Sequence, residues 1–216
     1  MHWLDNATLA KRATAEARAL APFVGTWGGR LAVQVGTPSV AFASPDKFAR
    51  CIVVSRDEAA AVRARAEALP LAEDSVDVLF LIHVLEETRH PAAVLAEAAR
   101  VLRGEGRVVV VGFRPLPPTL LRQLPRRIFR SPPRALGLFR LRLLLGRAGL
   151  AFERAPGLGG GPIVRHLPGQ WQQVFAGSYA VIGRKKIHGM TVLRPSWKRV
   201  ARKRRQAVLS GHGRAG

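Results

Sequence analysis

The longest stretch of regular hydrophobic patterning predicts a strand, a helix and a second strand. Residues 76–82 are almost all apolar, which is typical of a strand that is buried on both faces. Pro91 can begin a helix, because the first helical position needs no N–H partner, and Gly104 and Gly106 are expected to end it. Residues 107–112 (RVVVVG) supply the next buried strand. Two buried strands joined by one helix form parallel neighbours with a right-handed crossover.

Shorter patterns on both sides extend this unit into an α/β domain. We expect further helices over residues 7–21, 58–65 and 136–150, and further strands over residues 31–36, 51–55, 151–155 and 179–182. Pro22 is expected to lie just past the end of the first helix. The connection from Cys51 to Leu69 is short for a helix plus another strand, so one strand of the sheet is expected to be shortened or absent. The last two strands are expected to pair as a hairpin. The fold class predicted is therefore a Rossmann-like, doubly wound and mostly parallel sheet.

Length and composition are those of one globular domain with appendages. The chain has 216 residues, of which 48% are hydrophobic, and no apolar run reaches the length of a membrane span. The first 20 residues lack the apolar core of a signal peptide. Cys51 is the single cysteine, and the six histidines show no metal-ligand spacing. We therefore expect a cytoplasmic protein with no metal site.

Charge is distributed very unevenly along the chain. Residues 1–100 hold 11 Lys and Arg against 12 Asp and Glu, whereas residues 101–216 hold 24 against 2. Such a basic half indicates an anionic partner, which is either a nucleic acid, a phospholipid surface or an acidic protein. Uniform coding bias towards arginine is the alternative, but it does not explain why acidic residues are missing from one half only. The densest basic segment begins with Arg184 and ends with Arg205, so we expect nucleic acid or another anionic surface to bind there.

Domain boundaries follow from these changes in composition. We expect an α/β domain over residues 1–183 and a basic C-terminal tail over residues 184–216. Within the domain, residues 114–134 contain six prolines and six arginines and are expected to form a bent connection or a lid over the site. The helix expected over residues 136–150 is basic and amphipathic; it either covers the sheet or lies on a membrane surface.

Residues 69–106 carry the pattern of a known family. Five features match. The first three are an LPF-like triplet (Leu69-Pro70-Leu71), an acidic turn (Glu73-Asp74) and an S-x-D strand start (Ser75-Val76-Asp77). The other two are a strand that ends near a histidine (His83) and a helix that ends R-V-L-R-G-E-G (residues 100–106). This stretch resembles the class I S-adenosylmethionine-dependent methyltransferases, in particular their type 11 group. The resemblance implies the fold predicted above and S-adenosylmethionine as the cofactor. It implies cofactor contacts from Gly36, Thr37, Ser55, Asp57, Ala68, Leu69 and His83.

The cofactor segment departs from the family pattern at three places. Thr37, Pro38, Ser39 and Val40 follow Gly36 where the family has further glycines, and a missing glycine adds a Cβ where a ligand must pass close to the backbone. Ser55 and Arg56 stand where the family has an acid for the ribose hydroxyls. Asp57 follows closely and either replaces that acid or caps the next helix. Arg65 stands where the family often has an aspartate.

His83 is the titratable side chain expected at the mouth of the site. The ordinary pKa of histidine suits a general base for an oxygen or nitrogen nucleophile, so His83 is the candidate catalytic residue; a structural histidine is the alternative. Two functions follow. One is methyl transfer from S-adenosylmethionine to an unidentified acceptor, and the other is a catalytically degenerate methyltransferase-like domain that binds RNA or another polyanion through its basic half.

The segment after the last expected strand carries a second resemblance. Residues 185–197 are similar to the end of a methyltransferase-like group with the pattern K-R-x-x-G-M-T-P-L-R-P-x-W. Trp197 either stacks on a base of a nucleic acid or pins the tail to the domain.

Overall fold

The computed structural model describes residues 6–38, 40–57, 60–113, 135–154, 156–158 and 178–186. The backbone divides into two compact units, Met1–Lys186 and Ile187–Gly216. The second unit lies outside the described residues, as do the predicted connection over residues 114–134 and Trp197. The division of the chain into residues 1–183 and 184–216 therefore stays a prediction.

The first unit contains both helices and strands. The helices are α1 (Asn6–Val24), α2 (Val84–Glu87), α3 (Pro91–Val101) and α5 (Leu138–Arg147), and η1 (Pro45–Lys47) is a short 3-10 helix. The strands are β1 (Gly29–Gly36), β2 (Phe48–Ser55), β3 (Val62–Arg63), β4 (Val76–Ile82), β5 (Leu102–Phe113), β6 (Leu150–Arg154), β7 (Gly157–Leu158) and β8 (Ser178–Lys185).

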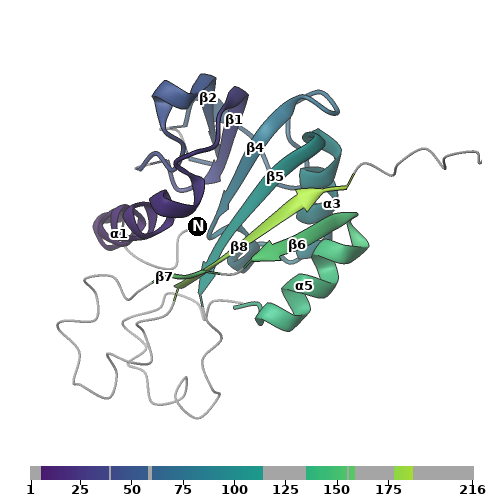
Figure 1. The fold of residues 1–216 in the computed structure, drawn as a ribbon. Helices are drawn as coiled ribbons and strands as arrows, with labels where there is room; N and C mark the ends of the chain where they lie inside the picture. The colour runs from purple at the N-terminus through teal and green to yellow at the C-terminus, as the bar shows by residue number, and fades with distance from the viewer. Residues whose placement is uncertain are drawn as a thin grey trace, which may run out of the picture. The chain divides into compact units, whose positions relative to one another are not determined.

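The strands form one mixed sheet, in the order β3-β2-β1-β4-β5-β8-β6, with β7 paired to β8 (Figure 1). The pairs β2–β1, β1–β4 and β4–β5 are parallel, whereas β8 is antiparallel to both β5 and β6. The predicted fold class and the parallel β4–β5 pair are confirmed. The third strand, expected to be shortened or absent, is present as the two residues of β3.

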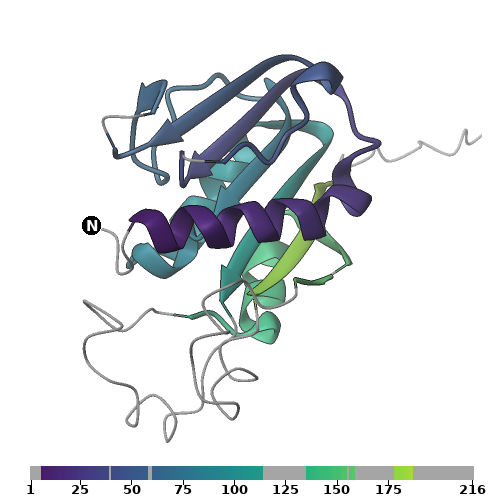
Figure 2. The ribbon, with the colours of Figure 1, turned by 90° about the vertical axis from the view of Figure 1, so that its left-hand side faces the viewer.

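The two faces of the sheet bury separate hydrophobic cores. On one face, Leu20 of α1 packs among Val78, Phe80 and Ile182. Figure 2 shows α1 crossing this face of the strands. On the other face, α3 and α5 cover the central strands, and their leucines, such as Leu95, belong to the same core as β4. All seven residues of β4 are buried, as its apolar sequence predicts for a central parallel strand.

Two expected helix ends and one expected helix are wrong. Helix α1 continues through Pro22 to Val24, because Val24 is buried against the sheet and packing stabilises the last turn. Helix α3 ends at Val101, and β5 begins at Leu102 and includes both glycines that were expected to end the helix. The helix expected over residues 58–65 is not formed over residues 60–65, which make a bend and β3. Pairing with β2 outweighs helix propensity there.

Within the described ranges, every helix is too short or too polar to cross a membrane.

Candidate functional site

A small cavity lies where β1, β2 and β4 end. Four predicted cofactor residues line it: Gly36, Thr37, Ser55 and Asp57. The chain runs outward from β1 to β2 and β3 and then returns to β4 on the other side of β1, so the strand order reverses beside this cavity. Open α/β sheets bind ligands at this kind of switch point. The cavity has a volume of about 40 Å³, far below the roughly 300–1,000 Å³ of ordinary ligand pockets.

Gly36 has a role in the fold itself. Its φ is +113°, and a Cβ added there would lie 2.2 Å from the carbonyl oxygen of Ile82. The close approach predicted for a ligand is thus occupied in part by the end of β4. Only glycine combines this backbone conformation with this contact.

The loop after Gly36 is organised by Gln34, a residue that sequence reasoning missed. Gln34 is buried on β1, and its Nε2 donates to the carbonyl oxygens of Thr37 and Val40, each at 2.7 Å. Its Oε1 accepts from the backbone N–H of Phe42 at 3.0 Å. These three bonds hold buried Thr37 in place without a helix between β1 and η1 in the described part of that connection. A polar residue inside an otherwise apolar strand is the signal that points to it.

The end of β2 brings Ser55 and Asp57 together. Ser55 is buried, and its hydroxyl accepts from the backbone N–H of Asp57 at 3.3 Å and lies 3.5 Å from the Asp57 carboxyl. Since residues 60–65 are not helical, the structure gives no support to the helix cap that was the alternative for Asp57. Asp57 instead lines the cavity, one residue after the positions of Ser55 and Arg56 where the family has its ribose-binding acid.

Glu67 and Thr88 close the cavity on the side of β3, and neither was predicted. The Thr88 hydroxyl donates to Glu67 at 2.7 Å, and Arg56 lies 3.3 Å from the same carboxyl group. Burial raises the pKa of Glu67, but the Thr88 hydrogen bond and the nearby Arg56 and Arg65 outweigh it, and the pKa lies below its usual value. With Asp57 and Glu87, the lining holds three acidic residues and one arginine.

Ala68 and Leu69 line a different hollow, beside Glu97 and Arg100. The N–H of Leu69 donates to Glu97 at 2.8 Å, and Arg100 donates to the Leu69 carbonyl at 3.2 Å. These contacts anchor the loop before β4 to α3. The structure therefore does not bring these two predicted residues into the cavity with Gly36 and Asp57.

His83 lies next to the cavity but points away from it, towards α1. It ends β4 in the left-handed region with φ of 56°, and its neighbours Ile82 and Val84 line the cavity. Its Nε2 lies 2.9 Å from the carboxyl of Glu16, and its ring stacks on Phe113 with centroids 4.1 Å apart. Only 5% of His83 is exposed.

Glu16 is the centre of a buried charged cluster that joins α1 to the ends of β4 and β5 and the start of β8. Besides His83, it binds Arg12 at 2.9 Å and accepts from the Ser178 hydroxyl. Arg12 also donates to Ser178, at 2.6 Å. Glu86 completes the cluster at 4.0 Å from His83 Nδ1 and accepts from the N–H of Phe113 at 2.7 Å. We call these residues the α1 cluster.

The α1 cluster keeps His83 protonated. Burial alone lowers the pKa of His83, but Glu16 and then Glu86 raise it to about 9. Burial likewise raises the pKa of Glu16, but His83, Arg12 and Ser178 lower it to about 2. Both partners are charged at neutral pH, and His83 Nδ1 has no hydrogen-bond partner among the described residues.

No three His, Cys, Asp or Glu side chains in the described ranges are grouped so that they could hold a metal ion.

A family model described as "Methyltransferase domain" matches residues 38–110. Among curated proteins, no sequence gives a significant match.

Solved structures share the fold at low identity. One is the protein in complex with the Trm112 methyltransferase activator of Haloferax volcanii, with a TM-score of 0.68, 16% identity, and coverage of 86% of this chain and 94% of that chain. A second is an S-adenosylmethionine-dependent methyltransferase of Thermotoga maritima, described as a possible histamine N-methyltransferase, with a TM-score of 0.61, 22% identity, and coverage of 83% and 92%. A third is the [4+2]-cyclase SpnF, with a TM-score of 0.58, 13% identity, and coverage of 79% and 80%. The third name shows that this fold alone does not determine the reaction.

Proposed function

We propose that the chain is an S-adenosylmethionine-dependent methyltransferase, because a methyltransferase-domain family model matches residues 38–110 and the chain has the class I methyltransferase fold. The observation that carries the proposal is the cavity at the switch point, which brings Gly36, Thr37, Ser55 and Asp57 together at the ends of β1 and β2. The methyl acceptor is not identified by any of these residues.

The residues around the cavity suit this cofactor in position and chemistry. The Asp57 carboxyl and the Ser55 hydroxyl are groups that hydrogen-bond ribose hydroxyls. Glu67 and Glu87 add acidic side chains that suit the positive charge of a sulfonium. The volume of about 40 Å³ does not admit a molecule of this size, so binding requires the residues that line the cavity to move apart.

When bound, S-adenosylmethionine supplies an activated methyl group, and the chain contributes alignment and exclusion of water. Ser55 and Asp57 would hold one end of the cofactor, and the turn at Gly36 would orient the other. The stacked ring of Phe113 and the buried α1 cluster would exclude water on the side of α1.

We infer that His83 is a positioning residue. A general base must offer a free lone pair, whereas a His83 with its pKa raised to about 9 is protonated at neutral pH and is paired with Glu16. The general-base role stays a prediction that a pH profile tests. If His83 is the general base, activity should rise as pH increases through about 9, and the His83→Gln variant should lose this pH dependence.

Calorimetric titration of the full chain with S-adenosylmethionine tests the function. Asp57→Asn is expected to weaken binding by about 10- to 150-fold, since hydrogen bonds to a charged group contribute roughly 1.5–3 kcal/mol. Asp46→Asn is the matched control, because Asp46 is exposed on η1 and does not line the cavity. At 100 times Kd, the wild type should gain about 2.7 kcal/mol of stability.

Absence of heat and of any melting shift at millimolar cofactor would overturn this proposal. The degenerate domain that binds RNA or another polyanion would then be the better description.

We retain the cytoplasm as the proposed location.

A further inference from the structure

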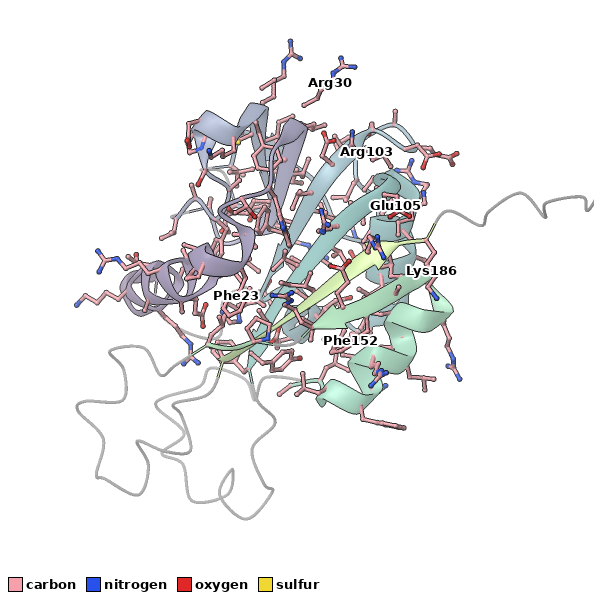
Figure 3. The ribbon with its side chains drawn as sticks, viewed as in Figure 1. Phe23, Arg30, Arg103, Glu105, Phe152 and Lys186 are labelled. Atoms are coloured by element: carbon pink, nitrogen blue, oxygen red, sulfur yellow. The ribbon has the colours of Figure 1, made fainter. Side chains whose placement is uncertain are left out.

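A second cavity lies at the opposite end of the strands, where β1, β2 and β4 begin. Its volume is about 690 Å³, within the roughly 300–1,000 Å³ typical of ligand pockets. Three arginines from three strands line it: Arg30 of β1, Arg50 of β2 and Arg103 of β5. Figure 3 shows Arg30 and Arg103 at the same end of the sheet. We call this cavity the arginine pocket.

The acidic residues in the arginine pocket already have cationic or N–H partners. Asp77 is 5% exposed, and its carboxyl accepts from the backbone N–H groups of Arg30 and Leu31 at 2.9 and 2.8 Å. Arg103 lies 2.6 Å from the same carboxyl. Asp74 pairs with Lys185 at 2.7 Å.

Arg30 and Arg50 are exposed and have no ion pair within the described part of the chain. With Asp77 matched by Arg103 and Asp74 by Lys185, these two guanidinium groups leave the pocket with an excess of two positive charges. Planar guanidinium groups bind phosphate through two parallel hydrogen bonds. The charge therefore favours a ligand that carries phosphate.

The floor of the arginine pocket is apolar. Leu31 and Ile52 line it and pack partly buried against the core that α3 and α5 cover. An apolar floor beneath a cationic rim suits a flat organic group that carries phosphate.

We propose that the arginine pocket binds a small organic phosphate of the nucleotide class. Arg30 and Arg50 bind the phosphate groups, Arg103 is held at the rim by Asp77, and the base or sugar lies over Leu31 and Ile52. The pocket is a separate site from the cofactor cavity. Arg30 and Gly36 are six residues apart on β1, which places them roughly 20 Å apart at about 3.3 Å per residue.

This distance excludes a reaction between ligands in the two cavities, since reacting atoms must approach to about 3–3.5 Å. The nucleotide is thus an effector or an anchor, and it is not the methyl acceptor. The basic tail is not a suitable ligand for the pocket, because residues 187–216 hold eight Lys and Arg and no Asp or Glu.

Equilibrium titration of the full chain with adenosine, AMP and ATP at constant ionic strength tests this inference. We expect ATP to bind more tightly than AMP, and adenosine to bind at least tenfold more weakly than AMP. Arg30→Gln with Arg50→Gln should weaken ATP binding at least tenfold. The control variant, Arg18→Gln with Arg147→Gln, removes the same charge from exposed positions outside the pocket. It should change the affinity for ATP less than twofold.

Equal losses in the two double variants would overturn the proposal, because they would show a non-specific charge effect. Binding of single-stranded RNA without binding of any mononucleotide would also overturn it, in favour of a nucleic-acid surface. If the double variant does not fold, Arg50→Gln and Arg50→Lys replace it. Lysine keeps the positive charge but lacks the planar guanidinium group. The Arg50→Lys variant should therefore bind ATP more weakly than the wild type and more tightly than the Arg50→Gln variant.

Discussion

Replacing Glu16 with glutamine removes the carboxylate at the centre of the α1 cluster. Glu16 is 1% exposed and contacts His83, Arg12 and Ser178. The variant leaves buried cations without their shared partner, and such a loss typically costs about 3–5 kcal/mol of unfolding free energy. Urea denaturation at pH 7 measures this cost.

The pH dependence of the same variant gives a sharper measurement. The pKa of His83 rises from 6.5 to about 9 on folding, so between these values the folded chain holds a proton that the unfolded chain has released. Stability from this pair is fully present below pH 6.5 and is lost as pH rises through about 9. At about 1.4 kcal/mol for each unit of pKa, the wild type should lose at most about 3.5 kcal/mol across this window. Glu16→Gln should lose much less, because the charge that raises the pKa of His83 is gone.

Glu105→Gln is the control for this experiment. Glu105 pairs with Arg184 at 2.7 Å, but its side chain is 50% exposed, and exposed pairs contribute only about 0–1 kcal/mol. A Glu16→Gln variant as stable as this control, or one with the wild-type pH slope, would refute the argument that the α1 cluster is a buried ion pair.

Three further predictions concern backbone and tail. Gly36→Ala should lower the unfolding free energy by more than about 3 kcal/mol, because its Cβ would lie 2.2 Å from the carbonyl oxygen of Ile82 at an unfavourable φ. Gly149→Ala is the control, since Gly149 has φ of +77° but nothing within 4 Å of an added Cβ; it should cost only about 1–2 kcal/mol in the same urea assay. Gly146→Ala in α5 should raise the melting temperature, since alanine is favoured over glycine in a helix by about 1 kcal/mol and nothing lies within 4 Å; a lower melting temperature would contradict this. Deleting residues 198–216 should reduce the slope of log K against log salt for single-stranded RNA by roughly 2–3, if about half of the seven basic residues removed contact phosphates; an unchanged slope would exclude the tail from binding.

Local pattern was sufficient to predict the central elements. The apolar runs of β4 and β5 require burial on both faces whatever surrounds them, and a short helical connection between them makes them parallel. The same reasoning failed for residues 58–65. Their alanines and charged residues favour a helix, but Val62 and Arg63 pair with β2 instead.

The candidate site was predictable only where it follows directly from strand ends. Ser55 and Asp57 were predicted because the family resemblance implies cofactor contacts at the end of this strand; β2 ends at Ser55, and both residues line the cavity. Glu67 was missed because its place depends on the path of a loop, which has no periodicity to read. Gly36 was expected to let a ligand approach the backbone closely. The register of β1 against β4 instead places Gly36 directly beside the carbonyl oxygen of Ile82.

By itself, the sequence determined the α/β class, the central strands and the charge asymmetry of the chain. Tertiary structure alone decided which charges meet. Glu16 lies 67 residues from His83, and Arg12 lies 166 residues from Ser178. The period of a helix or strand relates only near neighbours. Contacts at such separations depend on how α1 crosses the finished sheet, and the same is true of the arginine pocket, whose three arginines come from three different strands.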